Sequence, residues 1–360
     1  MCDDMVLMAE QDCSEQIAEQ VRRAARDRMP LQIVGGNSKS FYGRACSGAT
    51  LSTREHRGIV NYEPNELVLT ARSGTPLREI ESALSENGQM LAFEQPHFGA
   101  DATLGGTIAC NFSGPRRPYA GAARDFVLGT TIVNGRGEIL RFGGQVMKNV
   151  AGYDVSRLFA SSLGTLGVML DVSLKILPVA AQTTTLIMQC SSDRAIEQMN
   201  RWAASPLPIT ATCYDGDSLH VRLEGAATAV AKSKLQIGGE ELDGAEFWHK
   251  LREHQHSFFR TEKPLWRIAV APATPQLPIA GQYLLEWNGA QRWYITDTPA
   301  AEMRRIANDA GGHATLFRHG NSQSDVFHPL ASGIQQLHLQ LKNAFDPHGV
   351  FNRGKMYADF

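Results

Sequence analysis

The residues most suited to chemistry in this sequence lie in glycine-rich segments that offer backbone N–H groups and small polar side chains. The first is LQIVGGNSKSFYG (31–43), in which an apolar run leads into Gly35, Gly36, Asn37, Ser38, Lys39, Ser40 and Phe41. Glycine allows the backbone to approach a ligand closely, and successive N–H groups in a turn form an anion-binding nest. The segment predicts a diphosphate site at 35–40, where a side chain on Gly36 would occupy the place of the phosphates. Taken alone, it also fits a tight surface turn with an exposed lysine.

Three further segments extend this pattern. They are GADATLGGTIACNFSG (99–114), GYDVSRLFASSLGTLGVMLDVSLKILP (152–178) and FDPHGVFNRGKMY (345–357). Three glycine loops in order, each followed by an apolar run, indicate that one long ligand is held at several points. A dinucleotide fits, because it has a diphosphate, two sugars and two ring systems. The strict G-x-G-x-x-G spacing is absent from the first loop, which disfavours a Rossmann-type NAD enzyme.

The four segments together resemble the FAD-binding domain of the vanillyl-alcohol oxidase and p-cresol methylhydroxylase superfamily. Within it, GPRRPYAGAARDFVLG (114–129) and LRFGGQVMKNVAGYD (140–154) resemble the FAD-binding subunits of bacterial glycolate oxidase. The resemblance is close over 31–178 and brief over 345–357. It implies a two-lobed domain that encloses FAD. It also implies oxidation of glycolate to glyoxylate, with electrons passing through the flavin to an acceptor.

The resemblance also implies which residues surround the cofactor. Segment 99–114 would pass the flavin ring and ribityl chain, SSLGTLGVM would hold the adenosine half, and the C-terminal segment would return to the ring. The residues carried over are Thr103, Leu104, Gly105, Gly106, Asn111, Gly164, Gly167, Val168, Asn352 and Lys355. Asp125 lies in a segment that also approaches the cofactor, and a capping carboxylate at a surface turn explains it equally well. Arg353 replaces the proline usual in the C-terminal signature.

Covalent attachment of the flavin is not expected. The wider superfamily often attaches it through a histidine or cysteine beside the glycine loops, and GGNSKSFYG contains neither. Cys46 and His97 are the nearest candidates. We therefore expect noncovalent FAD.

A substrate-binding metal is not expected in this chain. Related 2-hydroxyacid dehydrogenases carry a His-x-His…Gly-Asp-Gly-Asn…His pattern that holds a metal and a catalytic base. Here the corresponding stretch, 311–328, keeps His313, His319, Asn321 and His328 but has lost the Gly-Asp-Gly core. Too few ligands remain for a cation, so no catalytic residue is assigned. Arg318 fits either a carboxylate clamp or an exposed arginine, and the spacing of His254 and His256 does not place both on one helical face.

Composition and charge narrow the possible partners. The 360 residues carry a net charge of −2 with 43% hydrophobic and 20% charged residues, which gives no electrostatic case for nucleic acid or anionic lipid. Six dispersed cysteines without a C-x-x-C pair favour neither an iron–sulfur cluster nor structural zinc. The acidic N-terminus lacks a secretory pattern, so the cytoplasm is expected, with contact to the inner membrane only through partners.

The resemblance implies two kinds of partner. One is a homologous FAD-containing subunit that carries the substrate chemistry on a small 2-hydroxyacid, and the other is an iron–sulfur subunit. Two alternatives stay open: a self-sufficient FAD-dependent 2-hydroxyacid dehydrogenase, and a non-catalytic flavin-binding scaffold.

Alternating helix and strand patterns predict an α+β fold. Ser14 should cap a helix over 14–28, and Thr75-Pro76 should open another with proline at its first helical position and Gly88 at its end. Hairpins are expected at 126–142, with a turn at Asn134-Gly135, and at 281–295, with a turn at Asn288-Gly289. We expect an FAD-binding domain at 1–180, an α+β cap domain at 181–330, and a C-terminal helix and tail at 331–360 that return to the FAD domain.

Overall fold

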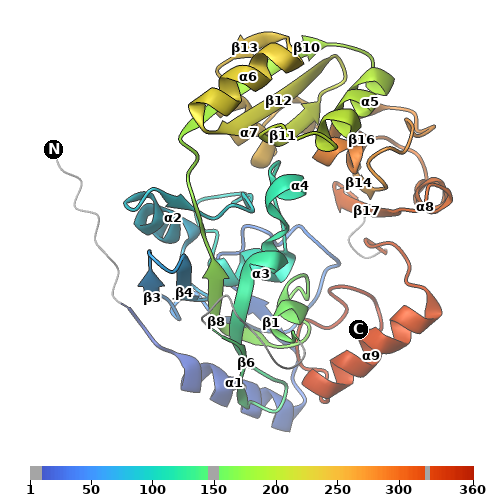
Figure 1. Cartoon of the computed structure of the whole chain (residues 1–360). Coiled ribbons are helices and arrows are strands. Elements are labelled where there is room, and N and C mark those ends of the chain that lie inside the picture. Colours follow the sequence, from blue (N-terminus) through green and yellow to red (C-terminus); the bar gives the residue numbers. More distant parts are fainter. Residues whose placement is uncertain (1–9, 145–153, 321–324) are drawn as a thin grey trace.

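The protein, described here from a computed structural model, is built around two antiparallel sheets. The structure describes residues 10–144, 154–320 and 325–360. Five strands form the sheet of the first lobe, in the order β3-β4-β8-β6-β7, and eight form that of the second, in the order β13-β10-β12-β11-β15-β16-β14-β17. Figure 1 shows the first lobe below and the second above. The α+β expectation is confirmed.

The first lobe contains the N-terminal half of the chain and the C-terminal helix. Its elements are α1 (Ser14–Asp27), β1 (Leu31–Val34), β2 (Ala49–Ser52), β3 (Ile59–Glu63), β4 (Val68–Arg72), α2 (Leu77–Ser85), β5 (Gln89–Met90), α3 (Leu104–Cys110), α4 (Arg117–Ala120), η1 (Ala123–Phe126), β6 (Val127–Val133), β7 (Ile139–Gly143), η2 (Ser156–Phe159), β8 (Val168–Lys175), β9 (Leu177–Pro178) and α9 (Ser332–Phe345). Strands β1 and β2 pair in parallel, and β5 and β9 form a second small pair.

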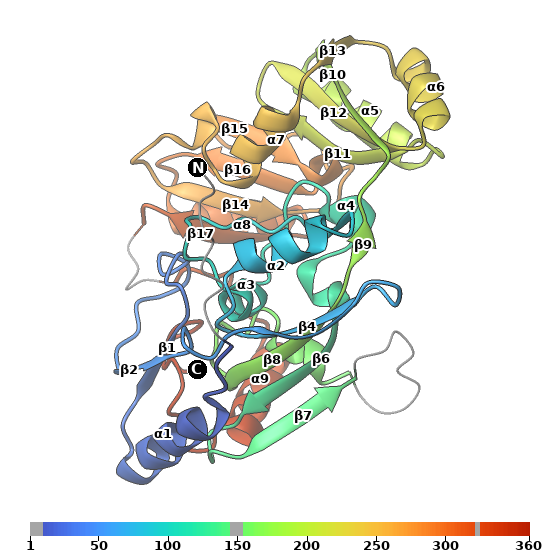
Figure 2. The ribbon, with the colours of Figure 1, turned by 90° about the vertical axis from the view of Figure 1, so that its left-hand side faces the viewer.

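The second lobe contains the remaining helices and strands. Its elements are β10 (Gln182–Gln189), α5 (Ser192–Ala203), β11 (Ile209–Tyr214), β12 (Ser218–Gly225), α6 (Ala227–Ile237), β13 (Glu240–Leu242), α7 (Ala245–Arg252), η3 (Ser257–Phe259), β14 (Leu265–Ala269), β15 (Gln282–Glu286), η4 (Trp287–Gly289), β16 (Gln291–Ile295), α8 (Ala300–Asp309) and β17 (His313–Arg318). Figure 2 shows this sheet lying across the end of the first lobe. The sequence limits of the expected domains, at 180 and 330, stay a prediction.

The helices follow the apolar periodicity of the sequence, but two of the expected start signals are wrong. In α1, Ile17, Val21 and Ala24 are buried as the pattern predicts. Ser14 does not cap this helix; Asp12 Oδ1 accepts the Ser14 N–H at 2.9 Å instead. In α2, proline is the N-cap and not the first helical residue.

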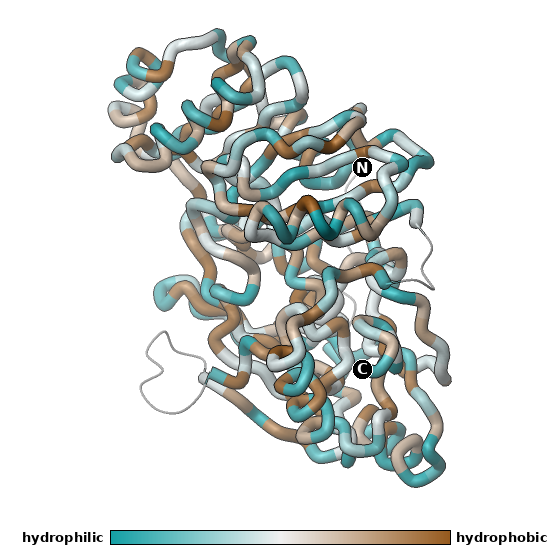
Figure 3. Tube along the Cα trace, turned by 90° about the vertical axis from the view of Figure 1, so that its right-hand side faces the viewer, coloured by the Kyte–Doolittle hydropathy of each residue, from teal (hydrophilic) through white to brown (hydrophobic). Residues whose placement is uncertain are grey.

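Both predicted hairpins form. Strands β6 and β7 pair around the 134–138 turn, and β15 pairs with β16 around η4. At the second turn Asn288 has φ 59°, a left-handed conformation that asparagine tolerates better than most residues. Figure 3 shows hydrophobic and hydrophilic residues alternating along the outer helices, as expected for helices that bury one face against a sheet.

The C-terminal segment returns to the first lobe. Leu31 forms a parallel bridge with Phe351, and its N–H donates to Val350 O at 2.7 Å. Within the described part of the chain, no helix is long and apolar enough to cross a membrane.

Candidate functional site

A cavity of about 120 Å³ lies where the glycine-rich segments meet. It is lined by part of the first loop, by α3, by the 163 turn and by the C-terminal segment. Of the predicted site residues, those that line it are Gly35, Gly36, Asn37, Ser38, Lys39, Ser40, Thr103, Gly106, Asn352 and Lys355. Segments from four separate parts of the sequence thus line one cavity, as a single long ligand would require.

The first loop is held against the 99–103 segment by a very close backbone approach. A Cβ on Gly36 would lie 1.4 Å from Asp101 O, and one on Gly35 would lie 2.5 Å from Thr103 Oγ1. These glycines are therefore required for packing one loop on the other. The expectation that a side chain at Gly36 would occupy the phosphate position is wrong, because its Cβ direction points into the neighbouring loop.

Two lysines, Lys39 buried and Lys355 partly buried, give the cavity its charge. Lys39 is 8% exposed, and its Nζ donates to His97 O at 3.1 Å and to Ser38 Oγ at 3.3 Å. Lys355 Nζ donates to Ser40 O at 3.3 Å. Burial lowers the pKa of both ammonium groups. Within the described ranges neither forms an ion pair with a carboxylate within 4.0 Å. Because a buried charge without a counter-charge is costly, the cavity fits an anionic group such as a diphosphate.

Asn352 connects two segments of the cavity wall through its side-chain amide. Its Oδ1 accepts the Ile33 N–H at 2.8 Å, and its Nδ2 donates to Leu163 O at 2.7 Å. The next residue in this turn, Gly164, has φ 72°, and a Cβ there would lie 2.8 Å from Asn352 Nδ2. The side chain of Asn352 therefore fixes β1 and the 163–164 turn in place.

Eight of the predicted residues, Asp125 and Gly164 among them, do not line the cavity. Gly105 faces Ser73: a Cβ added to Gly105 would lie 2.7 Å from the Ser73 Cβ. Leu104 is fully buried in the core. Asn111 ends α3, accepts the Arg124 N–H and donates to Ser161 Oγ. The others are Phe41, Gly167 and Val168. These residues shape or support the loops.

Asp125 also lies away from the cavity lining. Its Oδ2 accepts the Ala122 N–H at 2.9 Å and so caps the short helix η1, and its side chain is 44% exposed. The capping interpretation of Asp125 accounts for these contacts.

Several lining residues were not predicted as cofactor contacts. Tyr42, Cys110 and Leu163 line the cavity, and so does Cys46, which was considered only for covalent attachment. Tyr42 directly follows the predicted residues 35–41 in the same segment, so its position was a signal. Burial raises the pKa of the Cys110 thiol to about 11, which leaves it protonated at neutral pH.

Aromatic side chains fill the interface between this cavity and the second lobe. We call Phe41, Tyr42, Phe98, Phe112 and Phe317 the interlobe aromatic cluster; their rings lie 4.7–6.4 Å apart in edge-on and tilted contacts. Beside it the structure leaves a cavity of only about 30 Å³. Since one water needs roughly 10–15 Å³, this space suits a water or two and not a 2-hydroxyacid.

Two arginines of the second lobe face the interlobe aromatic cluster. Arg267 Nη2 donates to the Tyr42 hydroxyl at 2.9 Å, and Arg318 lies 4.1 Å from the centre of the Phe41 ring. Burial lowers the pKa of Arg318 to about 10, so it keeps its charge at neutral pH. Both therefore present partly buried positive charge toward the first loop.

The histidines of the degraded metal pattern do not converge. His313 and His328 lie with ring centroids 6.5 Å apart, whereas His319 follows the opposite end of β17 and its Nδ1 lies 4.0 Å from Glu262 Oε2. Asn321 lies outside the described residues. Within the described ranges, no group of three His, Cys, Asp or Glu side chains is arranged to hold a metal ion.

His254 and His256 lie in different surroundings. His254 stacks on Phe259 at 4.0 Å, and burial holds its pKa well below the usual range. The Nδ1 of His256 accepts the Phe258 N–H.

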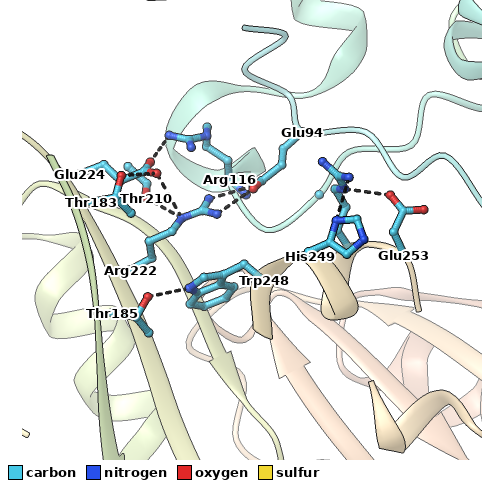
Figure 4. Close-up of polar contacts among 12 residues, drawn as sticks. Glu94, Arg116, Thr183, Thr185, Thr210, Arg222, Glu224, Trp248, His249 and Glu253 are labelled. Atoms are coloured by element: carbon cyan, nitrogen blue, oxygen red, sulfur yellow. Dashed lines mark hydrogen bonds and ion pairs between the residues drawn. The ribbon is translucent and has the colours of Figure 1, made fainter. Parts of the chain in front are cut away.

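Buried ion pairs join the two lobes, as Figure 4 shows. Arg222 on β12 makes two hydrogen bonds to Glu94, at 2.7 and 2.9 Å, and Arg116 pairs with Glu224. Burial alone would raise the pKa of Glu94, but Arg222 overrides this effect and lowers it. The second lobe is therefore held in a defined position over the first.

Comparison with known proteins agrees with this geometry. A family model described as an FAD binding domain matches residues 7–143. The chain is 48% identical over 353 residues to glycolate oxidase subunit GlcE of Escherichia coli (strain K12), which spans 98% of this chain and 100% of that relative. The chain belongs to this family of glycolate oxidase subunits.

More distant relatives match part of this chain in sequence or share its fold. Glycolate oxidase subunit GlcD of Bacillus subtilis (strain 168) is 28% identical over 236 residues, and the match spans 64% of this chain and half of that protein. Among solved structures, p-cresol methylhydroxylase superposes with a TM-score of 0.72 at 14% identity, over 98% of this chain and 88% of its own. The predicted fold type is thereby confirmed, and FAD is the cofactor of the family domain.

Proposed function

We propose that this chain is the FAD-binding subunit of a glycolate oxidase complex that oxidises glycolate to glyoxylate and passes the electrons through flavin to an acceptor. The observation that carries the proposal is the cavity formed by the first loop, α3 and the C-terminal segment. It lies largely within the stretch that matches an FAD binding domain. The full-length similarity to a glycolate oxidase subunit supports the reaction.

The first loop and the two lysines would bind the diphosphate of FAD. Lys39 and Lys355 supply the positive charge, and the backbone of 35–40 supplies N–H donors. Thr103, Gly106 and Asn352 would border the remainder of the cofactor. When bound, FAD supplies the hydride acceptor, whereas the protein supplies orientation and exclusion of water. With the Cys110 thiol protonated and no His or Cys in the first loop, we propose that FAD is held noncovalently.

We infer that a homologous flavoprotein subunit carries the substrate chemistry. In this chain the interlobe aromatic cluster fills the interface, and His313 and His319 lie at opposite ends of one strand. An iron–sulfur subunit would carry the electrons onward, since the cysteines of this chain are dispersed in sequence. We further propose that the complex is cytoplasmic and reaches the inner membrane only through those partners.

The absorption spectrum of the purified chain, before and after acid precipitation, tests cofactor binding. We expect a flavin spectrum, and we expect acid to release all flavin into the supernatant. A colourless preparation that does not take up added FAD contradicts the proposal, and yellow precipitated protein contradicts noncovalent binding.

The reaction is tested by glycolate-dependent dye reduction, with the chain alone and co-purified with the homologous flavoprotein and iron–sulfur subunits. We expect turnover only in the assembly. Comparable turnover by the isolated chain would identify a self-sufficient dehydrogenase. An assembly that keeps full activity when this chain is free of FAD would identify a scaffold.

A further inference from the structure

A carboxylate of the second lobe lies against the loop that orients the cofactor lysine. Glu253 follows α7 directly and is 9% exposed. Its two oxygens accept the His97 N–H at 3.2 and 3.1 Å, and one of them accepts the Phe98 N–H at 2.9 Å. Figure 4 shows Glu253 on the second-lobe side of the interface, where Arg252 Nε donates to it at 2.9 Å.

The same loop residue contacts Lys39 on its other side. His97 O accepts a hydrogen bond from Lys39 Nζ at 3.1 Å, so one residue connects Glu253 to the ammonium that faces the cavity. Among the described residues, every one that lines this cavity belongs to the first lobe. Glu253 is therefore a route by which the second lobe affects the cavity without contacting it.

Electrostatics act along the same route. Burial lowers the pKa of the Lys39 ammonium, and the negative charge of Glu253 opposes this effect. The Cys110 thiol also lies near Lys39 and would oppose it only as a thiolate. The other charged or titratable groups nearby are Lys355, which also interacts with Cys110, and the His97 imidazole, which bonds Glu81 Oε1 at 3.0 Å.

We propose that Glu253 is a positioning residue for FAD binding. It fixes the backbone of residues 97–98 that orients Lys39, and its negative charge lies near the Lys39 ammonium. Docking of the second lobe is thereby coupled to cofactor affinity. The inference rests on the proposed cofactor site.

Titration of the FAD-free protein with FAD, followed by flavin fluorescence, tests the coupling. Glu253→Gln keeps the shape but removes the charge and turns an NH₂ group toward one of the two backbone N–H groups. Since hydrogen bonds to charged groups contribute about 1.5–3 kcal/mol, we expect affinity to fall by about ten- to a hundredfold. Glu246→Gln is the matched control, because Glu246 lies in α7, the helix that Glu253 follows, and is 77% exposed. Within the described residues its ion pair is with Lys250, at 2.6 Å. An unchanged affinity in Glu253→Gln overturns the proposal.

The pH dependence of FAD affinity separates the effect of the Glu253 charge from the effect of its hydrogen bonds to residues 97–98. Affinity should fall at alkaline pH as Lys39 loses its proton. In Glu253→Gln this fall should begin at lower pH. In Arg252→Gln it should begin at higher pH, because the Glu253 charge then lacks its neighbouring guanidinium. If Glu253→Gln fails to fold, Arg252→Gln still tests the proposal. If the pH at which FAD affinity falls in Arg252→Gln is unchanged or lower, the proposal is overturned.

A double-mutant cycle with Lys39→Met completes the test. If Glu253 acts through Lys39, adding Glu253→Gln to Lys39→Met should change affinity by no more than about twofold. Full additivity overturns the inference. If Lys39→Met itself binds FAD as tightly as the unaltered protein, the proposed cofactor site is wrong instead.

Discussion

At the scale of single residues, the direction of an added Cβ decides which glycine substitutions can report on a ligand. A Cβ on Gly36 or Gly105 would point into neighbouring backbone or side chains, although Gly36 itself lines the cavity. Gly106 also lines the cavity, and a Cβ there would have only Thr103 Oγ1 near, at 3.4 Å. Substitutions at the first two would disturb loop packing and so report poorly on the cofactor. Gly106 is the informative position.

We expect Gly106→Leu to weaken FAD binding at least tenfold, because the new side chain enters the cavity that we assign to the cofactor. A tenfold loss corresponds to about 1.4 kcal/mol. Fluorescence titration measures it, and circular dichroism checks the fold. Gly333→Leu, at a position with open space around it, is the control. Full FAD occupancy in a folded Gly106→Leu protein would contradict the placement.

A second residue-scale prediction concerns Glu286. Burial raises the pKa of its carboxyl to about 7, although its Oε2 accepts hydrogen bonds from Trp293 Nε1 at 2.6 Å and Gln291 Nε2 at 3.0 Å. The folded state therefore binds a proton more tightly than the unfolded state. Stability should decrease as the pH rises from about 4.5 to 7.

Glu286→Gln should remove this dependence, because an amide oxygen accepts the same two hydrogen bonds without a charge. We expect the variant to gain on the order of 2 kcal/mol relative to the unaltered protein between pH 5 and pH 8. Urea unfolding at both pH values measures the gain. A pH-independent difference would show that the carboxyl is not responsible.

At the scale of elements, buried ion pairs fix the second-lobe sheet over the first lobe. Arg222 belongs to β12, and Glu94, its partner, lies in the connection between β5 and α3. The Trp248 indole on α7 packs 5.2 Å from the Arg222 guanidinium and donates to Thr185 Oγ1 on β10. Together these contacts join two strands, one helix and one loop into a single interface.

Arg222→Met should be strongly destabilising, because it leaves the buried Glu94 carboxylate without its partner. Removing one member of a buried pair typically costs about 3–5 kcal/mol. Glu94→Leu combined with Arg222→Met should recover much of this loss, since no uncompensated charge remains. Chemical denaturation of both proteins measures the difference. A double variant less stable than Arg222→Met would contradict this account.

At the scale of the whole molecule, the question is which subunit performs the substrate chemistry. The interlobe aromatic cluster occupies the interface that faces the cavity, and two arginines but no described metal cluster lie beside it. The geometry therefore supports a subunit that binds flavin and relies on a partner.

Replacing His313 and His319 together with Ala should leave the glycolate activity of the complex within about tenfold, because no proton transfer is expected from either imidazole. Steady-state dye reduction by the folded, FAD-replete complex measures this, with metal analysis of the isolated chain alongside. A loss of several hundredfold would mean that this chain carries a catalytic base, and the self-sufficient dehydrogenase would become the leading function.

The sequence by itself determined the local features. The apolar periodicity of α1 and the Asn-Gly turn between β15 and β16 are set by neighbouring residues, and both form as predicted. The glycine-rich segments indicated the family, because their backbone requirements are also local. Even here, the cap of α1 was misassigned: Cys13 is the N-cap and makes no side-chain capping bond, and Asp12 Oδ1 accepts the Ser14 N–H.

Only the tertiary structure decided how those segments are used. Gly36 meets Asp101 and Gly105 meets Ser73 across loops that the sequence does not connect, so neither contact has a local signal. Glu253 reaches the backbone of His97 from 156 residues away. Such contacts arise because packing two lobes brings together groups that each look ordinary in their own segment. That packing decided which residues face the cavity and which ones hold it in shape.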